Sequence, residues 1–314
     1  MITKLQTLIL TLMLGTGGVC YADEGDLVGI RPIGADARVV NQSPAELMAS
    51  LHFQKGKITL PSGIATLDLP PQYEYLPPEE ANKILVSAWG NPKRADTQGL
   101  IVAADHSVLG PDGWAVVVRY IADGHVRETE ADNLQYEDIL RGLQRQADED
   151  SAHRFKNGYN SLSLLGWADV PSYNPKTHQY DLAKELAVLG NTETTLNYDV
   201  RILGRQGVLD LNGVAPMHDY NLVKRHIDLL TGVTQFAAGQ AYSDFNPLTD
   251  HIAGYTATDM VKGYVSQMSW INNFWPTLLA LKYAVITAAL AMLLVFGTFL
   301  YSMRRIRRGR VYVR

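Results

Sequence analysis

Cysteine is almost absent from this chain, whose 314 residues contain only Cys20. Because Cys20 lies in an N-terminal segment that is expected to be removed, the mature chain should have no disulfide, no thiolate metal ligand and no cysteine nucleophile. The common catalytic motifs are missing too: there is no G-x-S-x-G, no H-E-x-x-H, no phosphate-binding glycine loop and no dinucleotide fingerprint. The sequence therefore predicts no catalytic residue and no cofactor, although these absences do not exclude an enzyme.

Basic side chains are scarce in the middle of the chain. All 32 acidic residues lie between residues 23 and 275, together with only 20 of the 28 basic ones, so this stretch has a net charge of about −12. Nucleic acids and anionic lipids select clustered cations, so we expect no nucleic-acid partner for this region.

The N-terminal 22 residues have the order of features found in a secretory signal peptide. Lys4 precedes an apolar run from Leu5 to Leu14, small residues follow, and Ala22 offers a cleavage position before two acids. About ten apolar residues are too few to span a bilayer, which argues against an uncleaved anchor.

The C-terminal region is long and apolar enough to cross a membrane. Between Leu278 and Tyr301 the only charged residue is Lys282, and at about 1.5 Å per helical residue the uncharged part covers roughly 30 Å. The tail, residues 302–314, holds six arginines and no acid. Because positive residues remain in the cytoplasm, we expect a single-pass membrane protein with a cytoplasmic tail and residues 23–275 outside, in the periplasm.

The first half of the outer region reads as strands interleaved with two helices. Residues 56–69 predict two short strands around a Pro-Ser-Gly turn, a helix is expected after Pro77-Pro78, and residues 114–121 predict a buried strand. Asn133 is the expected N-cap of a second helix, whose inward side chains are Tyr136, Ile139, Leu140, Leu143 and Ala147.

The second half predicts a meander of antiparallel strands followed by amphipathic helices. The expected strands are 162–168, 179–188, 195–203 and 208–214, and the helical stretches are 217–231 and 257–269. The predicted fold class is thus α+β, with antiparallel sheets and flanking helices in the outer domain, plus one C-terminal transmembrane helix. A division of the outer domain into two subdomains, with a break near 150–160, stays open.

The two strands on either side of Arg205-Gln206 specify their own register. With that dipeptide at the tip, one face pairs Ile202 with Leu209 and Val200 with Leu211. The other face pairs Arg201 with Asp210 and Asp199 with Asn212. We interpret this polar face as a solvated sheet surface with cross-strand ion pairs; the alternative is a site for a polar ligand.

Several blocks of the sequence are similar to one known family. In order, they are "ATLDLPPQYEYLPPEEANKIL", "WGNPK", "LLGWADVPSYNPKTHQYDLAKEL", "LNYDVRILGRQGVLDLNGVA" and "AYSDFNPLTDHIAGY". Together they cover most of residues 50–265 and resemble a family of uncharacterised membrane-anchored bacterial proteins, a domain of unknown function. The resemblance implies a location in the bacterial envelope, and it implies no activity, ligand or catalytic residue.

The loop 242–251 is the one place where the sequence offers candidate ligands for a metal ion. Asp244, Asn246 and Asp250 supply oxygens and His251 a nitrogen, although the loop lacks the glycine and glutamate that an EF-hand needs. The alternative, which we favour, is that Asp244 and Asn246 shape a turn and Asp250 caps the following segment. The eight histidines are scattered, and only His218 and His226 share a helical stretch, so we expect ordinary surface or half-buried roles for them.

Three functions are compatible with these observations. The first is a non-catalytic envelope protein that binds or scaffolds another protein, using aromatic side chains such as Tyr73, Tyr75, Tyr159 and Tyr173. The second is an envelope hydrolase whose site only the fold assembles. The third is a sensor of a small ligand or ion, although its short cytoplasmic tail has no room for an output domain.

Overall fold

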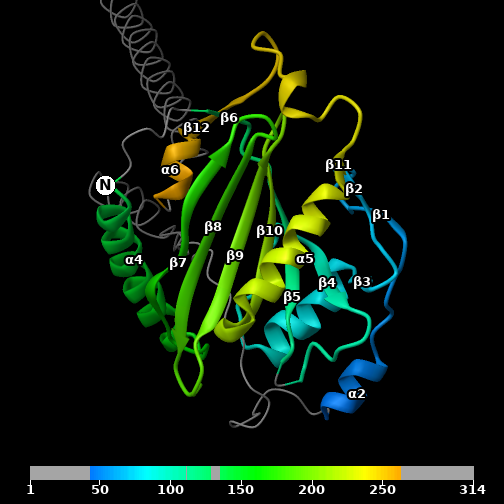
Figure 1. Cartoon of the computed structure of the whole chain (residues 1–314), viewed down its shortest axis with the longest axis vertical. Helices are drawn as coiled ribbons and strands as arrows, with labels where there is room; N and C mark the ends of the chain where they lie inside the picture. Colours follow the sequence, from blue (N-terminus) through cyan, green and yellow to red (C-terminus); the bar gives the residue numbers. More distant parts are fainter. Residues whose placement is uncertain (1–42, 111, 129–134, 263–314) are drawn as a thin grey trace, which may run out of the picture. The chain divides into compact units, whose positions relative to one another are not determined.

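The computed structural model describes residues 43–110, 112–128 and 135–262, and its main element is a seven-stranded antiparallel sheet (Figure 1). All of these residues belong to one compact unit, Met1–Val265. The predicted signal peptide (1–22), membrane span (278–301) and arginine-rich tail (302–314) lie outside the described residues. Within the part that the structure describes, no helix is long and apolar enough to cross a membrane.

The large sheet has the strand order β3-β4-β5-β10-β9-β8-β7. Its strands are β3 (Tyr73–Leu76), β4 (Thr97–Ala103), β5 (Ala115–Ile121), β7 (Leu162–Asn174), β8 (Gln179–Val188), β9 (Thr195–Leu203) and β10 (Val208–Pro216). Strands β7 to β10 are neighbours in chain order and pair antiparallel, which confirms the predicted meander. The α+β class with antiparallel sheets is confirmed for the described part of the chain.

In the first half, the short hairpin and the helix after Pro77 form as the sequence predicts, whereas strands β3 and β4 of the large sheet were not predicted. Strands β1 (Lys57–Thr59) and β2 (Ala65–Asp68) form the expected hairpin, and β11 (Thr234–Phe236) joins them in a three-stranded sheet. The helix after Pro77 is α3 (Pro78–Asn82), continued by the π-helix η1 (Lys83–Ala88). Unexpectedly, β6 (His125–Arg127) pairs in parallel with β12 (Ile252–Thr256), far along the chain.

One face of the large sheet packs against α5 (Tyr220–Gly232), the helix predicted around 217–231 (Figure 1). Val223, Ile227 and Leu230 of α5 are fully buried against β9 and β10. Gly213 of β10 permits the close approach, because a Cβ atom there would lie 2.5 Å from Ile227 Cδ1. The 3₁₀-turn η2 (Met217–Asp219) leads into this helix.

The opposite face carries two apolar clusters at its two ends. One contains α2 (Pro44–Ala49), α3 and η1 packed on β4 and β5. The other contains β6, β12 and α6 (Ala257–Val261) packed on the far ends of β5, β9 and β10. Polar side chains fill the space between the two clusters, and they are buried too.

The helix predicted after residue 133 is α4 (Tyr136–Lys156), and it lies along the edge strand β7. The N-cap is Gln135, so the predicted cap at Asn133 is wrong. Gln135 makes no side-chain capping bond, and Asn133 itself lies outside the described residues. Of the predicted inward residues, Ile139 and Ala147 are buried and the other three are partly buried. Gln144 and Ser151 of α4 bond backbone groups of β7, which protects this edge from pairing with another strand.

Candidate functional site

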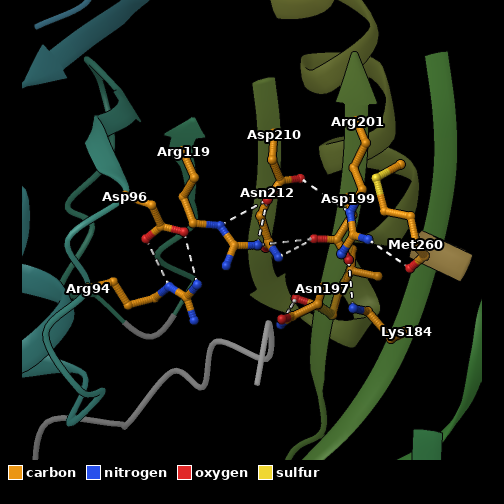
Figure 2. Close-up of polar contacts among 11 residues, drawn as sticks. Arg94, Asp96, Arg119, Lys184, Asn197, Asp199, Arg201, Asp210, Asn212 and Met260 are labelled. Atoms are coloured by element: carbon orange, nitrogen blue, oxygen red, sulfur yellow. Dashed lines mark hydrogen bonds and ion pairs between the residues drawn. The ribbon is translucent and has the colours of Figure 1, made fainter. Parts of the chain in front are cut away.

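The polar face predicted for β9 and β10 is the centre of a buried charged network (Figure 2). The predicted register is confirmed: Arg201 lies opposite Asp210, and Asp199 opposite Asn212. The expected solvation is wrong, because these four side chains are at most 3% exposed. Helices and strands from distant parts of the sequence cover both faces of the sheet, so alternation along one strand does not reveal a wet face.

Neighbouring strands extend this network on both sides, which the two-strand analysis missed. Arg119 of β5 pairs in register with Asp210, which pairs with Arg201, so cation, anion and cation alternate across three strands. On the other side Lys184 of β8 places its Nζ 2.8 Å from Asp199 Oδ2. The register of β8 against β9 was not predicted, so Lys184 had no assigned partner.

The contacts within the network use most of its charged atoms (Figure 2). Arg119 donates from Nε and from a terminal nitrogen to Asp210 Oδ2, at 2.9 and 2.5 Å. Arg201 Nε lies 3.9 Å from Asp210 Oδ1, and its guanidinium also donates to the Met260 carbonyl of α6 at 3.1 Å. Asn212 donates to Asp199 Oδ1 at 2.5 Å.

The burial of five charges in one network has an energetic consequence. Transferring an ion from water into a protein interior costs several kcal/mol, roughly, and mutual attraction offsets that cost only when the geometry is good. Each described carboxylate of the network touches a cation, so the charges stabilise one another. Because these side chains are buried, they belong to the structural core and do not form a surface that a ligand could contact.

The loop 242–251, which contains the candidate metal ligands, is built on the tip of the β9–β10 hairpin (Figure 1). Gly204 forms a β-bridge with Ala241, and the backbone N–H of Arg205 donates to the Gln240 carbonyl at 3.0 Å. Arg205 also forms a two-pronged ion pair with Asp250, with Nε–Oδ2 and NH2–Oδ1 distances of 2.7 and 2.9 Å. The Asp250 side chain is only 2% exposed.

The side-chain oxygens of Asp244 and Asn246 accept from nearby backbone N–H groups. Asp244, in the short 3₁₀-turn η3 (Tyr242–Asp244), accepts from the Ala241 N–H at 2.9 Å, and Asn246 Oδ1 accepts from the Leu248 N–H at 3.0 Å. These are the turn-shaping bonds of the alternative that the sequence favoured. Asp250 does not cap the following segment as predicted, because its carboxylate accepts from Arg205 and from the Asn246 N–H at 2.7 Å.

The remaining candidate, His251, is exposed, and its carbonyl accepts from the His125 N–H at 2.8 Å. Within residues 43–110, 112–128 and 135–262, no group of three or more His, Cys, Asp or Glu side chains is arranged to hold a metal ion. The bond from Arg205 is the main reason why the pKa of Asp250 lies well below its usual range. Asp250 is therefore a carboxylate committed to an arginine at neutral pH.

These bonds hold the loop in a closed turn, and a large apolar side chain is exposed at its apex. The Asn246 carbonyl accepts from the N–H groups of Thr249 and Asp250, at 3.1 and 2.9 Å, which closes the turn around Pro247. Leu248 at its apex is 92% exposed, the largest exposed fraction among the large apolar side chains described. The sequence analysis singled out the loop for its acids and missed this leucine.

A second polar group lies beside α5, where Lys224 reaches toward two tyrosines and an aspartate. Lys224 Nζ is 3.0 Å from Asp169 Oδ2 and 2.9 Å from the Tyr198 hydroxyl, and the Tyr220 hydroxyl donates to Asp169 at 2.7 Å. Burial raises the pKa of both tyrosines, and bonds to Tyr198 and Asp169 hold the pKa of Lys224 above its usual range. At neutral pH the two tyrosines and Lys224 keep their protons while Asp169 is ionised, so the arrangement is a hydrogen-bonded ion pair that holds α5 against the sheet.

The two histidines that share a helical stretch do not come together as ligands. The Tyr73 hydroxyl lies 2.6 Å from His226 Nδ1, while His218 is half-exposed and borders carboxylates of other residues. Tyr73 and Tyr75 are buried in the core, so their predicted role in a protein interface is wrong. Tyr159 and Tyr173 are partly exposed.

Comparisons with known proteins place the chain in a family and leave its activity open. The family model described as "Protein of unknown function (DUF2167)" matches residues 52–295. No curated protein matches the chain.

Two solved structures show a weak likeness to the chain. The first is cyanobacterial PsbP (CyanoP) from Synechocystis, with 10% identity and a TM-score of 0.33, covering 66% of this chain and all of that one. The second is the Saccharomyces cerevisiae Ran-binding protein Mog1p, with 11% identity and a TM-score of 0.29, covering 63% of this chain and all of that one. TM-scores this low carry no argument about fold or function.

Proposed function

The chain belongs to the DUF2167 family of proteins of unknown function, and from that premise we propose that it is a membrane-anchored envelope protein whose extracytoplasmic domain binds another protein. The apolar stretch 278–301, the arginines that follow it and the N-terminal signal pattern support the location. The net charge of about −12 between residues 23 and 275 argues against nucleic acid as a partner.

The observation that carries the binding role is the rigid presentation of Leu248. A single exposed leucine is ordinary on a protein surface, so its exposure alone means little. What distinguishes Leu248 is its scaffold: the Arg205–Asp250 ion pair and the turn bonds of Asn246 fix the loop before any partner arrives. A preorganised loop loses little conformational entropy on binding, which favours affinity.

The size of the effect follows from the leucine itself. Full burial of a leucine side chain stabilises a complex by about 1.5–3 kcal/mol, or roughly 10- to 100-fold in affinity. An anchor of this kind fits an apolar pocket on a protein, surrounded by polar contacts. Polar residues beside Leu248 could form the polar contacts around the pocket; they are Asp244, Asn246 and Thr249. They supply no positive charge, so the loop is poorly suited to binding an anionic lipid surface.

The location is tested with reporter fusions. We expect a reporter fused after residue 314 to be active only if it works in the cytoplasm, and one fused after residue 270 to be active only if it works outside. A tail found outside the cytoplasm overturns the orientation.

The binding role is tested by comparing two leucines in the native membrane. Leu189 is also well exposed, but it follows β8 at the end of the sheet opposite the β9–β10 tip. Tagged wild-type, Leu248→Asp and Leu189→Asp proteins are isolated from gently solubilised membranes, and the accompanying proteins are quantified. We expect one protein to be depleted at least tenfold with Leu248→Asp and retained with Leu189→Asp; equal recovery with all three overturns the proposal.

A further inference from the structure

Six ring side chains from three distant parts of the chain connect to one another near Glu128, at the end of β6. They are His125, Tyr173, His178, Tyr180, Tyr242 and Phe245. One stack contains His178, Tyr242, His125 and Phe245 in that order, with successive ring centroids 4.4, 4.3 and 3.8 Å apart. The other stack contains Tyr173 and Tyr180, with centroids 4.3 Å apart.

The Glu128 carboxylate joins the two stacks at the protein surface. The Tyr173 hydroxyl donates to Glu128 Oε1, and His178 Nδ1 contacts the same oxygen. The Glu128 and His178 side chains are 31% and 32% exposed, so solvent reaches this contact. Both contacts use Oε1, and within the described residues no other donor contacts the second carboxylate oxygen.

Two buried polar atoms in the same stacks have no hydrogen-bond partner among the residues that the structure describes. These are the Tyr180 hydroxyl and His125 Nδ1, in residues that are 1% and 6% exposed. Buried polar atoms in folded proteins nearly always have partners, so an orphan calls for an explanation. Burial raises the pKa of Tyr180 and lowers that of His125, and the nearby Glu128 charge acts on both groups.

The backbone at His178 is also unusual. Its φ of +52° is the one positive value at a non-glycine residue in the part of the chain that the structure describes. Such a conformation is uncommon, and it persists where the surrounding structure holds the residue in place. Here it positions the imidazole between Tyr242 and Glu128.

We propose that these rings and Glu128, which we call the aromatic cluster, form a binding site for a small organic cation that carries an alkylammonium or quaternary ammonium group. A cation over an aromatic face gains about 0.5–2 kcal/mol, and the carboxylate supplies the opposite charge. Tyr173 and His178 are the end rings of their stacks, so each has a face that no ring of its stack covers. Both contact Glu128, so the ligand's cation lies against these faces beside the second carboxylate oxygen.

Other ligand classes fit the aromatic cluster less well. An anion would face the charge of Glu128. A metal ion would need several oxygen or nitrogen ligands, and no such group exists within the described residues. The net charge of about −12 between residues 23 and 275 favours a positive ligand over a neutral one. This inference is independent of the docking role of Leu248.

The test uses the purified full-length protein in a neutral detergent, titrated with choline and followed by ligand-observed NMR and calorimetry. Its matched probe is 3,3-dimethylbutan-1-ol, which has the shape of choline without the charge. We expect choline to bind with a Kd on the order of millimolar and the alcohol to bind at least about tenfold more weakly. Equal binding of the two probes, or no choline binding at about 50 mM, overturns the proposal.

Variants separate the roles of charge and ring. Glu128→Gln and Tyr173→Leu should each weaken choline binding about tenfold, while Glu149→Gln, an exposed glutamate on α4, should leave it unchanged. Tyr173→Phe retains the ring and loses only the hydroxyl, so it should bind choline within about threefold of wild type. Circular dichroism checks that each variant folds; unchanged binding in folded Glu128→Gln contradicts the site.

Discussion

Replacing Asp210 by asparagine tests whether the buried network is held together by its charges. The substitution retains the size of the side chain and removes one of two carboxylates that face three buried cations. Arg119 makes two contacts to Asp210, at 2.9 and 2.5 Å, and Arg201 lies 3.9 Å away on the other side. The two arginines are at most 3% exposed, so water cannot replace the lost charge.

The expected cost is large for a single atom change. Removing one partner of a buried ion pair costs about 3–5 kcal/mol, a large part of the roughly 5–15 kcal/mol by which a domain is stable. We expect the midpoint of urea unfolding, followed by circular dichroism of the purified protein, to fall accordingly, with little change in slope.

Asp138→Asn is the matched control, because Asp138 pairs with Arg141 on the exposed surface of α4. Exposed ion pairs contribute about 0–1 kcal/mol, so this variant should unfold close to wild type. If Asp210→Asn and Asp138→Asn shift the midpoint equally, the network is not an electrostatic core and the reasoning fails.

Three further predictions concern the core and its titration. Arg201→Ala should lower the free energy of unfolding in urea by about 2–3 kcal/mol, because it removes a buried hydrogen bond to the Met260 carbonyl of α6. On a solvated sheet face the same substitution would be tolerated, so a decrease below about 0.5 kcal/mol contradicts the burial of Arg201. Gly213→Ala should destabilise by about 1–3 kcal/mol through its clash with α5, whereas Gly142→Ala, with open space in helix α4, should be neutral or stabilising; equal effects rule the clash out. Burial lowers the pKa of His125 below 6.5, so the unfolded chain binds this proton more tightly and stability falls as the pH drops below that value. His125→Phe retains the ring stack without the titration, so its melting temperature should fall less than that of wild type between about pH 7 and pH 5, and parallel curves would refute this assignment.

Local patterns in the sequence were sufficient for the four-strand meander, the helices α4 and α5 and the hairpin register, but they did not predict β3, β4 or the pairing of β6 with β12. The pairing of Val200 with Leu211 and of Arg201 with Asp210 follows from alternation along two adjacent strands and the turn between them. The helix α5 follows from apolar residues spaced by three and four, which Val223, Ile227 and Leu230 occupy in the structure.

Burial of the polar face could not be predicted, because it depends on which distant elements cover the sheet. Arg119 precedes Asp210 by about ninety residues, and no local pattern brings β5 beside β10. A hint existed in the sequence: Arg119 interrupts the apolar run 114–121, which otherwise reads as fully buried. A charge within such a run indicates a buried partner elsewhere.

In the loop 242–251, too, local bonds could be predicted and the long-range contact could not. The turn-shaping bonds of Asp244 and Asn246 are local, and the sequence favoured them correctly. The partner of Asp250 is Arg205, 45 residues earlier in the chain. This long-range ion pair anchors the loop that carries Leu248, and no local pattern predicts it. The aromatic cluster is equally non-local, because its rings come from three separate segments.

The most direct test of the account is photocrosslinking from Leu248 in living cells. A photoreactive amino acid is placed at residue 248, at residue 189 as the opposite-end control, and at residue 248 in an Arg205→Ala background that releases the loop. The account predicts one discrete protein adduct from residue 248, no such adduct from residue 189, and a strong reduction when Arg205 is absent. Adducts only to lipid, or the same adducts from both positions regardless of Arg205, would contradict a docking role for the loop.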